Sequence, residues 1–131
     1  MLFASLDTLA SGLTAQRLQM DVISNNLANA QTTTTPGGGP FREQLVQMTA
    51  IPLQSNGAGG VVVTDIVGNA APFPLRYDPA SPQANAQGYV RMPNVSSTAQ
   101  MVDLMAASRA YDANATAFSD VVKDQHSALQ I

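Results

Sequence analysis

The chain contains no cysteine and no tryptophan, and it has a single histidine among its 131 residues. Without cysteine there is no disulfide framework, no thiolate metal site and no thiol nucleophile. His126 lies in the last turns of a predicted helix and has no second histidine beside it. A Ser-His-Asp triad and a histidine metal site are therefore not expected. These absences argue against an enzyme and against a bound cofactor.

Charge is also scarce. Charged residues make up 11% of the chain, compared with about 25% in an average globular protein. The six Lys and Arg residues are scattered from Arg17 to Lys123, and the net charge is −3, so nucleic-acid binding is not expected. No apolar run approaches the roughly 18 residues of a membrane span. The N-terminal segment also lacks the basic start of a secretory signal. A surface with so little charge tends to associate with other surfaces.

Both ends of the chain carry a heptad pattern. Apolar residues recur at alternating spacings of three and four, which places one stripe on each of two predicted helices. The N-terminal stripe is Leu2, Leu6, Leu9, Leu13, Gln16, Met20, Ile23, Leu27 and Ala30. The C-terminal stripe is Met101, Leu104, Ser108, Tyr111, Ala115, Phe118, Val122, Gln125 and Leu129. We expect these stripes to pack as the seam of a coiled coil or helix bundle.

The limits of the two helices are marked by local signals. The threonines at 32–35, Pro36 and the glycines at 37–39 predict the end of the first helix and a flexible hinge. Ser97 and Gln100 predict a capping box at the start of the second. No residue after Thr98 breaks this helix for about thirty residues, or roughly 45 Å.

The middle of the chain is rich in β-branched residues, proline and glycine. Strands are predicted over 41–51, 60–67 and 88–92, with a turn over 56–60, while four prolines over 72–82 predict short extended pieces. The fold class is thus α+β, with two long terminal helices around a small β-rich module. The expected segments are an N-terminal helix (1–33), the hinge and module (34–96) and a C-terminal helix (97–131).

Two further features each allow two interpretations. Asp120 and Asp124 share a helix face beside Lys123, and a solvated face explains them better than a metal or acid/base pair. The two helices could form a hairpin inside a soluble binding module, or they could pack against other subunits. The amides of Asn25, Asn26, Asn29 and Asn114 favour the second alternative, because neutral amides can bridge subunits without burying a charge.

Two sequence blocks resemble one family. Ser11-Gly12-Leu13-Thr14-Ala15-Gln16, followed by Ser24-Asn25-Asn26-Leu27-Ala28-Asn29 and Thr32, resembles the N-terminal signature of bacterial flagellar axial proteins. Tyr77-Asp78-Pro79 and Gly88-Tyr89-Val90-Arg91-Met92-Pro93-Asn94-Val95 resemble the proximal rod proteins of this family, as does Ala107-Ser108-Arg109-Ala110-Tyr111-Asp112-Ala113-Asn114. Ser81 stands where the family usually has histidine, and residues 34–71 match only loosely.

The resemblance implies a structural, non-enzymatic subunit of the flagellar basal-body rod, which transmits torque across the periplasm. It implies self-assembly through the terminal helices, and export without a cleaved signal peptide by the flagellar type III apparatus. The implied partners are other copies of the chain, other rod proteins, the inner-membrane ring adaptor and the export apparatus. No cofactor, nucleic acid or small-molecule substrate is implied. The alternatives are another axial protein or a soluble helical-hairpin binding module.

We expect the coiled coil to form on assembly, because each helix alone exposes its stripe and the central module is too small to cover both. The expected assembly interface combines both stripes with nearby amides and one arginine. Its residues are Leu6, Leu9, Leu13, Gln16, Met20, Ile23, Asn26, Leu27, Met101, Leu104, Ser108, Arg109, Tyr111, Asn114, Ala115, Phe118 and Val122.

Overall fold

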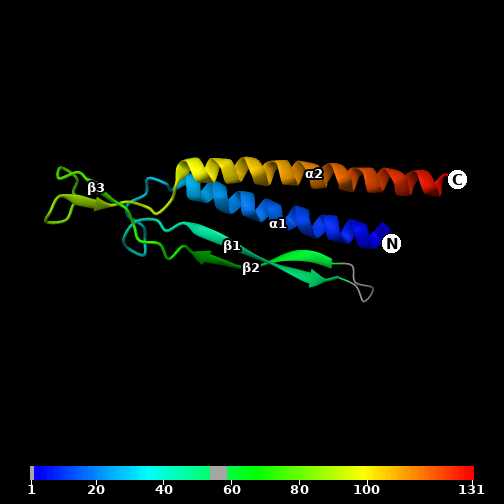
Figure 1. Cartoon of the computed structure of the whole chain (residues 1–131), viewed down its shortest axis with the longest axis horizontal. Helices are drawn as coiled ribbons and strands as arrows, with labels where there is room; N and C mark the ends of the chain where they lie inside the picture. Colours follow the sequence, from blue (N-terminus) through cyan, green and yellow to red (C-terminus); the bar gives the residue numbers. More distant parts are fainter. Residues whose placement is uncertain (1, 54–58) are drawn as a thin grey trace.

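The computed structural model describes residues 2–53 and 59–131 and contains two helices and two small antiparallel sheets. The elements are α1 (Leu2–Ala28), β1 (Gln44–Pro52), β2 (Gly59–Gly68), β3 (Leu75–Tyr77), β4 (Tyr89–Arg91) and α2 (Ser97–Leu129). The helices lie side by side in antiparallel orientation, and the β1–β2 hairpin runs along α1 (Figure 1). The predicted α+β class, with terminal helices around a small β-rich module, is confirmed.

Helix α1 lies between two partners, whereas α2 has one. Among the described elements, α1 contacts α2, β1 and β2, and α2 contacts only α1. In Figure 1, β3 lies at one end of the elongated molecule and the C-terminal end of α2 lies at the other. One long side of α2 is therefore left without a partner among the described elements.

Strand β1 begins three residues later than the predicted strand 41–51 and ends one residue later, whereas β2 extends one residue beyond the predicted 60–67 at each end. Its register runs from Gln44 opposite Gly68 to Pro52 opposite Gly59, with an irregularity between Gln47 and Met48. Such a bulge increases the local twist of a ribbon, which lets the hairpin follow α1. The predicted turn at 56–60 falls mainly outside the described residues.

The second sheet is a short ribbon in the proline-rich segment. Strand β4 was predicted over 88–92, whereas β3 was not predicted as a strand. Tyr77 lies opposite Tyr89 in this ribbon, and their rings meet edge to face at 5.3 Å. The ribbon is extended by a hydrogen bond of 2.8 Å from the Met92 amide to the Pro74 carbonyl.

The start of α2 differs from the prediction. The N-cap is Ser96, whose side chain accepts a hydrogen bond of 3.3 Å from the Ala99 amide. The predicted capping box of Ser97 and Gln100 is therefore wrong. Gln100 cannot serve the helix end because its side chain is buried, with its amide engaged by Asn26 and Glu43. The uninterrupted course of α2 to Leu129 is confirmed.

The hydrophobic core is made of small side chains. The buried apolar residues in the described part of the chain are Ala4, Ala15, Val22, Ile23, Ala30, Val90 and Ala107. The largest fully enclosed side chain is the amide Asn26, whereas Leu, Met and Phe side chains stay at least partly exposed. No helix in 2–53 or 59–131 has the length and apolarity that crossing a membrane requires.

Candidate assembly interface

Asn26 forms the centre of a polar junction between α1, β1 and α2. Its Nδ2 donates to the Gln44 carbonyl at 2.9 Å and to Gln100 Oε1 at 3.1 Å. Its Oδ1 accepts from the Gln44 amide at 3.0 Å. The side chain is only 1% exposed, and every polar atom has a partner. A buried amide held in this way specifies one arrangement of the segments that it joins.

The junction continues through Glu43 into the segments around it. One carboxylate oxygen of Glu43 accepts from Gln100 Nε2 at 2.6 Å, and the other accepts from Asn69 Nδ2 at 2.8 Å. The Glu43 amide donates to Asn94 Oδ1 at 2.7 Å, and Asn94 Nδ2 donates to the Asn69 and Ala71 carbonyls, both at 3.0 Å. The chain before α2 and the chain after β2 are thus fixed to the end of α1.

Ser11 and Gly12 place α1 in close contact with both of its neighbours. Ser11 Oγ accepts from the Val61 amide of β2 at 3.1 Å and donates to the Thr8 carbonyl at 2.7 Å. On the next residue, a Cβ added to Gly12 would lie 3.3 Å from Asn114 Nδ2 of α2. A glycine inside a helix costs about 1 kcal/mol relative to alanine. Here it allows the two helices to approach closely.

The predicted interface residues of α1 all lie at least partly buried. Ile23 and Asn26 are buried, and Gln16 Oε1 accepts a hydrogen bond of 3.1 Å from Asn114 across the helix pair. The others are partly exposed: Leu6, Leu9, Leu13, Met20 and Leu27. The contacts that define the side of α1 facing α2 come from Gly12, Gln16 and Asn26. Asn26 itself is engaged entirely within the chain.

The predicted interface residues of α2 divide into two groups. Leu104, Ser108, Tyr111, Asn114, Ala115 and Phe118 are partly buried, whereas Met101, Arg109 and Val122 are exposed. The line that faces α1 contains Gln100, Ala107 and Asn114, because these residues are buried or bond across to α1. The stripe positions Met101, Ser108 and Ala115 follow this line by one residue, or about 100° around a helix. The other stripe positions Leu104, Tyr111 and Phe118 follow it by four residues and therefore share its face. Arg109 takes part in no ion pair with a described residue.

On both helices, the stripe positions that lie one residue after the contact line form one surface, which we name the composite flank. On α1, Leu13 and Leu27 also follow residues that face α2 by one position. On each helix, the position one residue later is rotated by about 100° about the helix axis, in the same sense when the helix is viewed from its N-terminus. Because the two helices run in opposite directions, these rotations move the positions on both helices toward the same side of the pair. The cross-helix contacts place Leu13 level with Ala115 and Leu27 level with Met101. The composite flank consists of Leu6, Leu13, Met20 and Leu27 from α1 and Met101, Ser108, Ala115 and Val122 from α2.

Large apolar side chains remain exposed at the start of α2. Met101, Val102 and Met105 are each 55% exposed. Met105 lies four residues after Met101 and three residues after Val102, and these spacings make it a neighbour of both on the helix surface. Single exposed apolar residues are ordinary, but adjacent ones of this size mark an interaction surface. Sequence analysis missed Val102 and Met105, because only one stripe per helix was sought.

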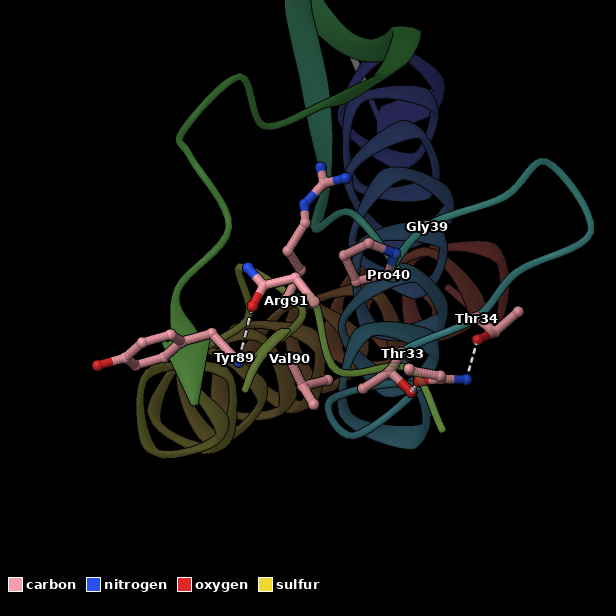
Figure 2. Close-up of a pocket in the computed structure, with 9 residues that line it drawn as sticks. Thr33, Thr34, Gly39, Pro40, Tyr89, Val90 and Arg91 are labelled. Carbon is pink, nitrogen blue, oxygen red and sulfur yellow. Dashed lines mark hydrogen bonds between the residues drawn. The ribbon is translucent and has the colours of Figure 1, made fainter. Parts of the chain in front are cut away.

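The loop after α1 packs against the β3–β4 ribbon, and a small open cavity lies between them (Figure 2). The Thr33 and Thr34 hydroxyls both bond to the side-chain amide of Gln83. The cavity beside them has a volume of about 280 Å³ and is open to solvent. Tyr89 and Arg91 point away from the two threonines (Figure 2). The residues around the cavity are therefore joined by neutral hydrogen bonds and not by charges.

The structure supplies no catalytic arrangement within the residues it describes. Across 2–53 and 59–131, no three His, Cys, Asp or Glu side chains gather where they could hold a metal ion. His126 contacts the Gln130 side chain at 3.2 Å on the exposed last turn of α2.

Comparisons with known proteins agree on one family. Residues 6–34 match the family described as flagella basal body rod protein, and residues 86–131 match the flagellar basal body rod FlgEFG protein C-terminal family. The flagellar basal-body rod protein FlgC of Borreliella burgdorferi is 43% identical over 147 aligned positions, covering 99% of this chain and 97% of the relative. The FlgC proteins of Bacillus subtilis and Escherichia coli O6:H1 are 40% and 42% identical, covering 98% and 88% of this chain and 97% and 86% of theirs.

Proposed function

Because this chain belongs to the FlgC family of flagellar basal-body rod proteins and is a structural subunit of the rod, we propose that its composite flank packs against neighbouring subunits. The exposed apolar residues Val102 and Met105 extend this surface around α2. The neighbours are other copies of the chain and other rod proteins. In this arrangement the residues that hold the two helices together differ from those that meet the next subunit.

The observation that carries this proposal is that small apolar side chains are buried while larger ones are exposed. Alanine and valine dominate the buried apolar set, while Met101, Val102 and Met105 are more than half exposed. Complete burial of a methionine or valine side chain contributes about 1.5–3 kcal/mol. Covering the exposed half of these three side chains would thus contribute about 3 kcal/mol, a factor of about 100 in an association constant.

The same surface suggests how the helices gain stability. The single chain buries few large side chains, so much of the stabilisation of two long helices is left to neighbouring subunits. We propose that the coiled coil becomes fully ordered on assembly. In the assembled rod the subunit would transmit torque across the periplasm and contact the inner-membrane ring adaptor. It would reach the rod through the flagellar type III export apparatus without a cleaved signal peptide.

Met101 gives a direct test of the proposed packing. Met101→Gln keeps the length of the side chain and removes its apolar character, whereas Met101→Leu keeps the apolar character. Each variant would be expressed in a strain that lacks the natural chain, and rods would be counted in isolated basal bodies together with swimming in soft agar. We expect the glutamine variant to reduce both measures and the leucine variant to behave like the natural protein.

The control is the folded stability of the purified chains. Since Met101 is exposed, both variants should unfold within about 0.5 kcal/mol of the natural protein. Normal rod numbers with Met101→Gln and with the further change Met105→Gln would contradict the proposed packing.

A further inference from the structure

Two arginines share one aromatic ring at the boundary between the helices and the β3–β4 ribbon. The guanidinium carbon of Arg42 lies 4.3 Å from the centre of the Phe73 ring, and that of Arg91 lies 4.8 Å from the same centre. The two positive charges are therefore separated by at most about 9 Å, the sum of these distances. Stacking on an aromatic face holds a guanidinium in place while its N–H donors stay available.

Neither arginine is neutralised within the described chain. Arg42 donates to the carbonyls of Asn69 and Ala71 at 2.6 and 3.1 Å, and no described carboxylate lies within 4.0 Å of either guanidinium. The carboxylate of Glu43, the residue after Arg42, accepts hydrogen bonds from two amides and forms no ion pair with either arginine. At physiological salt, charges this close still repel each other. The pair is thus a local excess of positive charge in a chain whose net charge is −3.

The arginines line an open cavity large enough for a side chain. Its volume is about 480 Å³, and its lining includes Arg42, Phe73, Arg91 and the loop residues Gly38 and Pro40. Arg91 also borders the smaller cavity described above, but its side chain points away from Thr33 and Thr34 (Figure 2). Cavity, stacking and unneutralised charge occur together only here among the described arginines.

We propose that the Arg42–Phe73–Arg91 site receives a carboxylate side chain from a neighbouring rod subunit. Two guanidinium groups beside an open cavity fit the two oxygens of an Asp or Glu side chain, through short charge-assisted hydrogen bonds. The acidic partner surface is illustrated by α2 of this chain, which carries Asp103, Asp112, Asp120 and Asp124, all exposed and without an ion pair to a described residue. The inference rests on the proposed packing between rod subunits and names a second, polar contact within it.

A zero-length cross-link tests this contact directly. A carbodiimide activates a carboxylate, and a lysine amine then displaces the urea leaving group to form an amide bond. Arginine does not react in this way, and Lys123 is the only lysine of the natural chain. Arg91→Lys keeps the positive charge and introduces a reactive amine. Isolated basal bodies carrying this variant would be treated with carbodiimide and analysed by mass spectrometry of tryptic peptides.

We expect a new peptide that joins position 91 to an Asp or Glu of another subunit, absent from the natural chain. Arg76→Lys is the matched control, because Arg76 pairs with Asp78 of its own chain at 4.0 Å. That variant should give a link to Asp78 within the chain. An Arg76→Lys link to Asp78 without any link from position 91 to another subunit would overturn the proposal.

A charge reversal provides the second measurement. Arg91→Glu should abolish swimming while leaving the melting temperature of the purified chain unchanged, and Arg76→Glu should leave swimming intact. A large fall in melting temperature for Arg91→Glu would assign the arginine a role within the chain instead. If Met101→Gln reduces rod numbers while Arg91→Glu does not, only the carboxylate contact is refuted. If Met101→Gln assembles normally, also with the further change Met105→Gln, the apolar packing is refuted independently.

Discussion

Replacing Asn26 tests whether the polar junction determines how the helices and the hairpin are arranged. Asn26→Ala would remove three hydrogen bonds, two to the backbone of Gln44 and one to Gln100. An unsatisfied buried polar group costs about 1–3 kcal/mol. Gln44 is partly buried, so losing each of its two bonds should cost near the lower end of this range, whereas Gln100 is buried and its bond should cost more. We expect a loss of about 3–4 kcal/mol in the free energy of unfolding.

This loss is a large fraction of the roughly 5–15 kcal/mol that is typical for the free energy of unfolding of a native protein. At about 3–4 °C per kcal/mol for a chain of this size, the melting temperature should fall by about 10 °C. The measurement is urea and thermal unfolding of the purified full chain, followed by circular dichroism. Asn26→Asp should be at least as destabilising, since it keeps the shape of the side chain but replaces the Nδ2 donor with an acceptor.

Asn25→Ala is the matched control for this prediction. Asn25 is the neighbouring residue of the same type, but it is exposed, and its side chain bonds only to Asn29. Its replacement should change the unfolding free energy by less than about 0.5 kcal/mol. Equal effects of Asn25→Ala and Asn26→Ala would refute the reasoning, because burial and partners would then not determine the cost.

Two glycines provide further predictions. Gly12→Leu should destabilise the folded chain by about 1–3 kcal/mol, because even a Cβ would lie 3.3 Å from Asn114 Nδ2; unfolding of Gly12→Ala, with its smaller side chain, gives the comparison. Gly88→Ala should cost about 1–2 kcal/mol, because Gly88 has φ of 86° and its Cβ would lie 3.0 Å from Tyr77 Cε2. Gly37→Ala is the control for this loop glycine, because nothing lies within 4 Å of the added Cβ. If Gly88→Ala lowers the free energy of unfolding no more than Gly37→Ala does, the argument is contradicted.

The helices could be predicted because their signal is repeated many times along the chain. Each heptad stripe contains nine positions, so an error at one of them does not change the interpretation. The β1–β2 hairpin was similarly clear from its β-branched residues. Strand β3 has only three residues, and its pairing depends on β4, which lies more than ten residues away. A segment this short carries too little local signal to be distinguished from an extended loop.

The side on which the helices meet could not be predicted from hydrophobicity alone. The contact line of α2 runs through Gln100, Ala107 and Asn114, which are small or polar, whereas the large apolar side chain of Met101 lies one residue later and is exposed. Close packing across Gly12 favours small residues at the contact, and buried amides are favoured once they have partners. The seven-residue repeat of Gln100, Ala107 and Asn114 was a usable signal that a search for large apolar side chains overlooks.

The junction around Asn26 has a mechanical consequence. The start of α2, the base of the hairpin and the approach to the β3–β4 ribbon are all tied to the end of α1 by directional hydrogen bonds. Apolar surfaces can slide past one another with little change in energy, whereas a hydrogen bond weakens steeply once its angle is distorted. A twisting force applied to the ribbon would therefore strain these bonds before it moved the helices. We therefore expect the subunit to resist rotation most strongly at the point where its helical and β-rich parts meet.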